Sequence, residues 1–434
     1  MSFKGKMSIL GLSALIALYA VVGGMLSPWT RAQQPINDSG AQMRIFESVL
    51  QHIQNDYVDD PNLEKVRLGA LRGLAGGLDP YSSYLTADQV KEYNTSKNAN
   101  KVGIGAEFSQ VSLYLYVVSV TKGSTAEKAG LKAGDVIEYI EGKATRDISL
   151  YDAKQMVLGE SGSTVNMRVL RSGAKPQNIR IPRAAVKTPQ VETKVESGRV
   201  GVIKVFSLES GEAADIKNAV QSLTKQGVQK IVLDLRGVAS GSIDEAVAVA
   251  NLFIPDGELA KIVGKDNAVT KVYTADPSKV IFNGQMNVLI DLGTAGAGEV
   301  VAGAILDRKR GEVVGERSFG AGVEQTLFPL RSGDGLLLTV AKWASPAGKP
   351  FLGEDRASMG VKPSVEVKRP DTPEPVEVEE LIDQQEEQDQ DPQPNASPSP
   401  AVEKPKVQQE DVQLKKAIEL LQDKAQTAKS GASE

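Results

Sequence analysis

Cysteine is absent from the 434 residues, and histidine occurs once, as His52. Without cysteine the chain can form no disulfide, no thiolate-ligated zinc site and no cysteine nucleophile. A single histidine excludes a multi-histidine metal site, and any Ser-His-Asp triad would have to run through His52. Because His52 lies in a helical stretch with no serine–aspartate constellation nearby, we interpret it as a surface or packing residue.

A basic cluster is also missing. The chain has 50 Lys and Arg against 55 Asp and Glu, a net charge of −5. Residues 371–434 hold 16 acidic and 6 basic residues, a net of −10, whereas the first 370 hold 44 basic and 39 acidic residues, a net of +5. This balance excludes nucleic acid as a partner. Apolar residues make up 41%, enough for real cores, and the length suggests about two to four domains.

No charge interrupts residues 7–26, an apolar run that follows Lys4 and Lys6. Basic residues before such a run direct a segment to export. About 20 residues can span a bilayer as a helix. Residues 1–34 are therefore predicted to be either a signal peptide, with a weak cleavage motif near Ala32, or an uncleaved membrane anchor. Both alternatives predict an exported chain, periplasmic or anchored in the inner membrane facing outward.

Four regions follow the apolar run. Residues 41–97 have helical apolar spacing, with a capping box at Thr86 and Gln89, and are predicted to be a helical N-terminal region. Residues 101–185 show strand alternation with glycine at the turns, which predicts a β-rich domain. Residues 370–434 are acidic and rich in Pro and Gln, so we expect a disordered tail. Within it, residues 412–425 carry the spacing of one helix, transient or docked.

The region at 190–368 alternates strand and helix. Apolar strands are expected at residues 200–205, 231–235, 288–290 and 312–314, and helices at 213–224, 243–253 and 299–306. This rhythm predicts an α/β domain with a largely parallel sheet. Active sites of such sheets lie at strand-to-helix turns, so we expect any chemistry after residues 235 and 290.

Two segments of the β-rich region resemble the PDZ domain. They are Gly-Ile-Gly-Ala-Glu-Phe at residues 103–108 and Gly-Ser-Thr-Ala-Glu-Lys-Ala-Gly-Leu-Lys-Ala-Gly-Asp at residues 123–135. A glycine-rich loop before a strand leaves backbone N–H groups free for a peptide's terminal carboxylate, and the strand edge can pair with the peptide backbone. We predict that the cradle consists of Gly103, Ile104, Gly105 and Ala106. The alternative is a PDZ fold used only for packing or regulation.

Several further segments, in order along the chain, resemble the carboxyl-terminal processing peptidases, or tail-specific proteases. They are Leu-Asp-Pro at 78–80, Asp-Leu-Arg-Gly-Val-Ala-Ser-Gly at 234–241, Gly-Thr-Ala-Gly-Ala-Gly-Glu at 293–299, Gly-Glu-Arg-Ser-Phe-Gly-Ala-Gly-Val-Glu-Gln at 315–325, Leu-Thr-Val-Ala-Lys at 338–342 and Gly-Val-Lys-Pro at 360–363. The resemblance covers residues 41–368. It implies an α/β core with the ClpP/crotonase-like fold and an inserted PDZ domain.

The resemblance also implies a Ser/Lys dyad, in which a desolvated lysine acts as the base for serine. This sequence has Gly296 at the nucleophile position and Ala321 at the lysine position, so both reactive groups are missing although their spacing is kept. Gln325 matches the family's polar helper. The backbone N–H groups of Gly241 and Ala297 can still form an oxyanion hole, because main-chain donors survive side-chain changes. The altered run at 237–240 changes the surroundings of that hole.

Two main functions remain open, with a third alternative beside them. One is a non-catalytic relative that binds C-terminal tails or unfolded segments of exported proteins, with an active relative or a second copy as a further partner. The other is an active serine endopeptidase whose nucleophile has moved to Ser318, Ser240 or Ser242, with Lys342 nearby in sequence. A third alternative is an exported structural protein with an empty groove. No cofactor or metal is expected, and the membrane is a partner if the anchor is uncleaved.

Overall fold

The computed structural model describes residues 38–95, 100–111, 113–355, 357–369 and 410–430, with side chains up to Asp423 in the last segment. The predicted signal or anchor at 1–34 therefore lies outside the described residues. Within them, no helix is long and apolar enough to cross a bilayer. The chain divides into two units, Met1–Ala70 and Leu71–Glu434, which are described separately.

In the first unit, helix α2 (Ser39–Asp56) begins after Asp38, whose side chain accepts a bond from the Gly40 N–H. Helix α3 (Leu63–Gly76) starts in this unit and ends in the second. His52 is exposed on α2, and its Nδ1 lies 2.6 Å from Asp56 Oδ2, one turn away. The surface interpretation of His52 is confirmed.

The second unit opens with strand β1 (Ser83–Leu85) and helix α4 (Ala87–Thr95). The Thr86–Gln89 capping box is present, with the Thr86 N–H donating to Gln89 Oε1 at 2.9 Å and the Gln89 N–H donating to Thr86 Oγ1 at 3.5 Å. The helical region predicted at 41–97 is present as α2, α3 and α4, and the short strand β1 within it was not anticipated. All three residues of β1 are buried, so they show neither the helical nor the strand periodicity of apolar residues. The local sequence pattern therefore cannot reveal this strand.

Residues 106–182 form a β-rich domain. Its main sheet has the strand order β2 (Ala106–Val111), β3 (Tyr114–Val120), β4 (Val136–Ile140), β6 (Thr164–Arg171), β7 (Ala174–Pro182), and β5 (Lys143–Ala144) pairs with β4. Strand β2 is an edge. Helices α5 (Thr125–Lys128) and α6 (Leu150–Val157) complete the domain, with Ser124 and Ser149 as N-caps.

The core domain is built on a six-stranded sheet. Its order is β17 (Val365–Glu366), β14 (Glu312–Gly315), β13 (Gln285–Ile290), β10 (Lys230–Asp234), β9 (Val200–Lys204), β8 (Glu192–Glu196). All neighbours are parallel except the edge pair β8–β9. The α/β prediction with a largely parallel sheet is confirmed. The continuous apolar run of β10 is buried on both faces, as parallel strands require.

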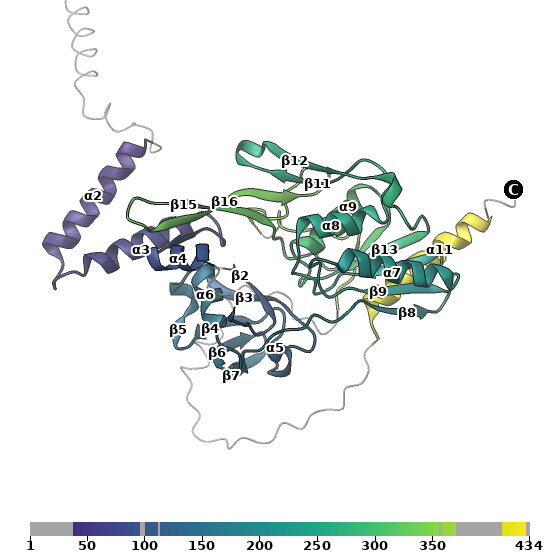
Figure 1. The fold of residues 1–434 in the computed structure, drawn as a ribbon, viewed down its shortest axis with the longest axis horizontal. Helices are drawn as coiled ribbons and strands as arrows, with labels where there is room; N and C mark the ends of the chain where they lie inside the picture. Colours follow the sequence, from purple (N-terminus) through teal and green to yellow (C-terminus); the bar gives the residue numbers. More distant parts are fainter. Residues whose placement is uncertain (1–37, 96–99, 112, 356, 370–409, 431–434) are drawn as a thin grey trace, which may run out of the picture. The chain divides into compact units, whose positions relative to one another are not determined.

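Helices cover both faces of this sheet (Figure 1). Helices α7 (Glu212–Lys225), α8 (Ile243–Asn251) and α9 (Ala297–Asp307) enclose the larger core, which contains Leu233, Val288 and Val300. Helix α9 is apolar all round and buried along nearly its whole length, which suits a central helix. Helix α11 (Val412–Ser430) packs on the opposite face with its own cluster.

An antiparallel sheet, not anticipated from the sequence, stands beside the parallel one. Its order is β1, β16 (Gly335–Ala344), β11 (Glu258–Val263), β12 (Val269–Thr274), and β15 (Val323–Pro329) also pairs with β16. Short 3₁₀ turns complete the described elements: η3 (Thr145–Asp147), η4 (Lys265–Asn267), η5 (Pro277–Lys279). Strand β16 matters for the site because it carries Trp343 and Lys342.

The prediction of a disordered tail through residue 434 is wrong for the segment around α11. Residues 370–409 and 431–434 lie outside the described residues, but Leu414 and Leu421 are buried against the core sheet. Composition predicted disorder because the acidic stretch before the helix dominates the average. The apolar positions of one short helix are enough to dock it once the core supplies a complementary face.

Candidate functional site

The candidate site lies where the parallel strands β10 and β13 end. Two loops follow these strands, residues 235–242 and 291–296, and they are bonded to each other. The Ala295 N–H donates to the Val238 carbonyl at 2.9 Å, and the Gly237 N–H donates to Asp291 Oδ1 at 2.9 Å. This is the strand-to-helix edge at which α/β sheets place their active sites.

Gly296 occupies the turn between β13 and α9. Its φ is 50° and its ψ −107°, a conformation that side-chain-bearing residues rarely adopt. A Cβ at this position would lie 3.7 Å from the Trp343 ring and 4.0 Å from the Ala239 carbonyl oxygen, so a side chain has room. A strained strand–turn–helix of this kind is how a nucleophile is presented above a sheet. Gly296 keeps the turn and supplies no nucleophile.

Glu299 joins the two vacant dyad positions. Its Oε2 accepts the N–H groups of Gly296 and Ala321, each at 2.8 Å. Its Oε1 accepts the Ser318 hydroxyl at 2.5 Å and the Gly320 N–H at 2.8 Å. The backbone N–H groups of Gly296 and Ala321 therefore bond to the same carboxylate oxygen, so these two nitrogen atoms lie close to each other.

The environment of Glu299 is fully buried. Burial raises the pKa of Glu299 to about 7, against the four hydrogen bonds, which lower it. Glu299 was not among the site residues predicted from the sequence. The sequence feature that could have indicated its role is its position as the third residue of α9, after the N-cap Gly296. A glutamate at that position can accept a hydrogen bond from the N-cap N–H, as in a capping box.

Ala321 lies in an apolar cluster with Val118, Ala295 and Phe319. Val118 belongs to strand β3 of the β-rich domain, and the ring of its neighbour Tyr116 stacks on Phe319 at a centroid distance of 5.7 Å. The position where the resemblance places a basic lysine thus holds a methyl group in an apolar setting. A methyl group accepts no proton, so this arrangement cannot activate a hydroxyl.

The two predicted oxyanion-hole amides are both present at this edge. Gly241 has φ +134°, and a Cβ there would overlap the Leu208 carbonyl, so the backbone requires glycine. Ala297 is the first residue of α9. In the described part of the chain, neither the Gly241 nor the Ala297 N–H donates a backbone hydrogen bond. The oxyanion hole formed by these two amides stays a prediction.

The side chain of Gln325 bonds to the segment before β1, and not to a dyad position. Its side-chain amide donates to the Tyr81 carbonyl at 2.8 Å, and the side chain is exposed. The structure uses this residue to fasten the segment around Tyr81 to strand β15. An amide has no basic nitrogen, so Gln325 cannot replace the missing lysine.

The serines considered as alternative nucleophiles are not bonded to a basic lysine in the hydrogen bonds described below. Ser318 donates to Glu299 and accepts the Val361 N–H at 2.7 Å, and it is completely buried. Ser242 caps α8 by accepting the Glu245 N–H. Side chains that accept hydrogen bonds from lysines include Glu192, Asp234, Tyr273 and Glu419, none of them a serine. Within the described residues, no three acidic or histidine side chains form a metal cluster.

The glycine-rich loop before β2 has the hydrogen bonding that a carboxylate cradle needs. The carbonyls of Gly103, Ile104 and Gly105 accept bonds from the N–H groups of Ala184, Ala126 and Thr121 respectively, at 2.8–3.0 Å. Within the described residues, the N–H groups of Gly103, Ile104 and Gly105 donate no backbone bond, so they can receive an anion. The Ile104 side chain is buried in the domain core, and only 1% of the residue is exposed.

Beside this loop, edge strand β2 is in contact with helix α6. Ala106 begins the strand, so it follows the free amides directly. Glu107 comes next. Burial raises the pKa of its carboxyl, while the nearby Lys154 of α6 lowers it. The interaction of these two charged residues was missed, because β2 and α6 are far apart in the sequence.

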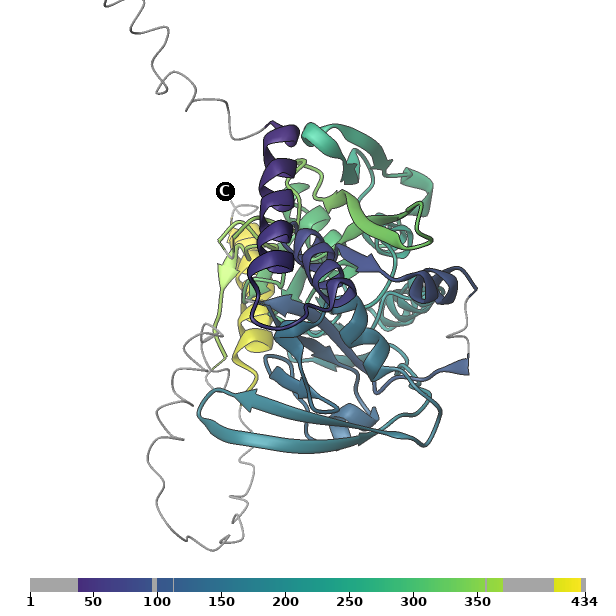
Figure 2. The ribbon, with the colours of Figure 1, turned by 90° about the vertical axis from the view of Figure 1, so that its left-hand side faces the viewer.

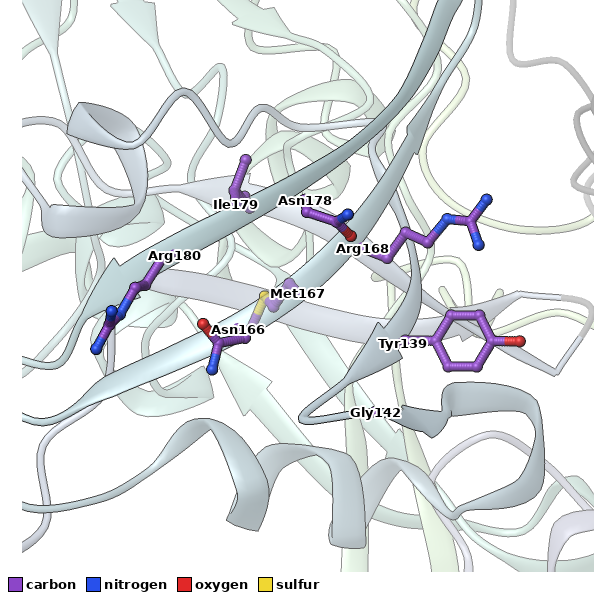
Figure 3. Close-up of a pocket in the computed structure, with 8 residues that line it drawn as sticks. All are labelled: Tyr139, Gly142, Asn166, Met167, Arg168, Asn178, Ile179 and Arg180. Atoms are coloured by element: carbon purple, nitrogen blue, oxygen red, sulfur yellow. The ribbon is translucent and has the colours of Figure 1, made fainter.

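A pocket of about 330 Å³ lies on the β4–β6–β7 face of the same domain (Figure 3). Eight residues line it: Tyr139, Gly142, Asn166, Met167, Arg168, Asn178, Ile179, Arg180. Arg168 is already paired with Glu138 at 3.2 Å, and Asn166 with Glu141. No dyad or cradle position contributes to the lining, so this pocket is separate from the candidate site.

Comparison with known proteins identifies the family. The model "Peptidase family S41" matches residues 199–367, and a "PDZ domain" model matches residues 116–171. The chain is 34% identical over 332 residues to a "Probable CtpA-like serine protease" of Staphylococcus aureus (strain MRSA252), covering 76% of this chain and 66% of the relative. The chain belongs to peptidase family S41.

Two other matches agree. The chain is 32% identical over 335 residues to a "Probable CtpA-like serine protease" of Staphylococcus haemolyticus (strain JCSC1435), covering 77% of this chain and 66% of the relative. The solved "photosystem II D1 C-terminal processing protease" has a TM-score of 0.63 at 29% identity, covering 74% of this chain and 86% of that one. The chain thus spans about two thirds of the curated relatives' length. The predicted α/β core with its PDZ domain and helical N-terminal region is confirmed.

Proposed function

We propose that this S41 protein is a non-catalytic member of its family that binds the C-terminal tails or extended segments of exported proteins. One observation carries the proposal. Gly296 and Ala321 flank the same Glu299 oxygen at the turn where the fold would present a nucleophile and its base. The scaffold of a reaction site is in place, and both reacting side chains are absent from it.

The binding half of the proposal rests on the PDZ domain. Strand β2 is an unpaired edge, and the amides at 103–105 before it are free. A peptide added along β2 places its terminal carboxylate at these amides, which is the recognition mode of strand addition. The retained Gly241 and Ala297 amides support a second contact, to a carbonyl of the bound chain, at the vacant site.

Export and membrane attachment are part of the proposal and follow from sequence alone. Lys4 and Lys6 before the apolar run at 7–26 support a signal peptide or an anchor. The bound tails would then belong to proteins outside the cytoplasm. An active S41 relative or a second copy of this chain is the expected companion, because a tail-binding protein without a nucleophile needs another agent to process what it holds.

Labelling with a serine-reactive fluorophosphonate separates this proposal from an active enzyme with a relocated nucleophile. The full chain is expected to form no stoichiometric adduct, since Ser318 is buried and bonded to Glu299, and Ser242 caps helix α8. An active S41 peptidase serves as the positive control. A stoichiometric adduct on any serine contradicts the non-catalytic proposal.

Tail binding is tested with a fluorescent peptide library that has free apolar C-termini and with the same peptides amidated. Amidation removes the terminal carboxylate, so we expect affinity to fall at least about tenfold. The Gly105→Ala variant should also lose binding, because its Cβ would overlap Ser124. Gly142→Ala is the matched control: it has a similar φ of +76° but open space around the Cβ. Equal binding of free and amidated peptides contradicts the cradle.

A further inference from the structure

Helix α11 is set apart from the rest of the core in sequence. The S41 match ends at residue 367, and residues 370–409, rich in Pro, Gln and acidic residues, separate the match from the helix. The helix lies on the face of the core sheet opposite α7–α9, as Figures 1 and 2 show in yellow. The core of this domain is thus covered on one face by a segment attached through a long connection.

The contact between α11 and the sheet is apolar at its centre. Leu414, Ala417, Ile418 and Leu421 are each at most 9% exposed. They pack on a five-residue apolar face of the sheet: Val200, Val202, Val232, Leu289, Val314. These helix positions follow the i, i+3, i+4, i+7 spacing of one face, which is the pattern by which a helix is recognised in a groove.

Asp411 performs two tasks at the start of the helix. Its Oδ1 accepts the Leu414 N–H at 3.0 Å, which caps α11. The same carboxylate takes two bonds from the Arg236 guanidinium, at 2.9 and 2.8 Å. Starting the helix and contacting the core therefore use one side chain, so helix formation and docking are coupled.

Further polar contacts fix the register of the helix. The Gln413 amide donates to the Val367 carbonyl at 2.8 Å, and the Asn287 amide donates to the Ala417 carbonyl at 2.9 Å. Near the other end, the Gln422 amide donates to the Ser197 carbonyl at 3.1 Å. Each of these bonds joins one particular helix residue to one particular core residue. The helix is therefore held in one register, which apolar packing alone would not define.

The core remains electrostatically satisfied if the helix leaves. Arg236 is also bonded to Asp234 through two atoms, at 2.9 and 2.7 Å, so undocking strands no buried charge. Most helical stability in proteins comes from packing of the apolar face, so the free segment would lose much of its helix. The docked helix and the undocked segment are therefore both accessible states of the same chain.

We propose that the outer face of the core sheet is a helix-docking site and that residues 410–430 of the same chain are its ligand, folding onto the face as they bind and leaving it reversibly. The tether keeps the ligand at high effective concentration, so the docked state dominates in the intact chain. The docked helix also bonds Arg236, which belongs to the loop 235–242 that follows β10. The proposal does not depend on the proposed tail binding.

The first test uses hydrogen exchange on the intact chain. The amides of residues 415–423 should exchange by local opening, at least tenfold faster than those of β10 in the same core. Asp411→Ala should accelerate exchange in α11 at least a further tenfold and leave β10 unchanged. Lys415→Ala is the control, because Lys415 is exposed and pairs only with Glu410 among the described contacts. Exchange of α11 at the same rate as β10 overturns the proposal.

The second test cuts the tether after folding. A site-specific protease sequence is inserted near residue 390 of the full chain, and a fluorescent peptide of residues 410–434 is added before and after cleavage. The peptide should bind the cut protein at least tenfold more tightly than the uncut one, where the tethered helix competes. Peptides with Ile418→Asp should fail to bind, and those with Lys415→Ala should bind normally. A cut protein that never exchanges its own helix for the peptide contradicts the proposal.

Discussion

Glu299 is fully buried yet bonded by four donors, and this combination makes the site sensitive to pH. Its pKa of about 7 in the folded protein exceeds the unfolded value of 4.5. The folded state therefore binds the proton more tightly, and the contribution of Glu299 to stability is greatest below pH 4.5. It falls as pH rises to about 7 and is constant above that.

We expect the Glu299 titration to lower the free energy of unfolding by about 3 kcal/mol between pH 4.5 and pH 7. Urea unfolding at several pH values, compared between the wild type and Glu299→Gln, measures it. The variant should be less stable overall, by about 1–3 kcal/mol, because an amide donor then faces backbone donors. It should lack the wild-type decline across this range, and an unchanged decline in the variant would show that another group titrates.

At the residue scale, the sequence predicted which positions are vacant but not how they are arranged. Gly296 and Ala321 follow from motif spacing. Their common partner Glu299 does not, because a glutamate inside an apolar helix gives no local sign of what it will bond. The interaction between Glu107 and Lys154 was missed for the same reason. Each gains its meaning from an element distant in sequence.

At the element scale, the Leu-Asp-Pro motif has a structural explanation. Asp79 Oδ1 accepts the Tyr81 N–H at 2.7 Å, the Ser82 N–H at 2.9 Å and the Thr339 hydroxyl at 3.1 Å, and its Oδ2 accepts the Ser82 hydroxyl at 2.8 Å. This carboxylate shapes the turn before β1 and fixes that strand to β16. The motif therefore attaches the end of the helical region to the antiparallel sheet.

Asp79→Ala should lower the free energy of unfolding by about 2 kcal/mol, because it leaves several donors without their acceptor. Chemical denaturation measures the loss. Asp88→Ala, at an exposed position in the first turn of α4, is the control and should cost less than about 1 kcal/mol. A change at Asp79 no larger than that at Asp88 would mean that the turn is held by other contacts.

Helices and strands were predicted well where their apolar residues follow one periodicity over a long segment. Helices α7 and α9 and strand β10 follow from their patterns. Strand β1 and the antiparallel sheet were not predicted, because short or two-sided strands such as β12, exposed on both faces, carry no alternation. Helix α11 could be expected as a helix, but its docking depends on the apolar face formed by Val202 and Leu289, which no local window contains.

At the scale of the whole molecule, the PDZ domain and the core share the cluster at the vacant site. Tyr116 and Val118 of strand β3 pack with Phe319 and Ala295, which lie next to the dyad positions. In this arrangement a lysine at position 321 would be surrounded by apolar groups, which lower an amine's pKa and make it a base. The environment for the missing chemistry is therefore largely preserved.

The most direct test of the central claim compares the native chain with Gly296→Ser/Ala321→Lys on an unfolded protein substrate that ends in apolar residues. Each single variant is a control, since one dyad member alone should be inactive. The serine adopts a φ of about 50° at a cost of about 1–3 kcal/mol, so folding of every variant is checked by circular dichroism. The account predicts cleavage by the double variant alone. Cleavage by the native chain would contradict the account and place a nucleophile elsewhere.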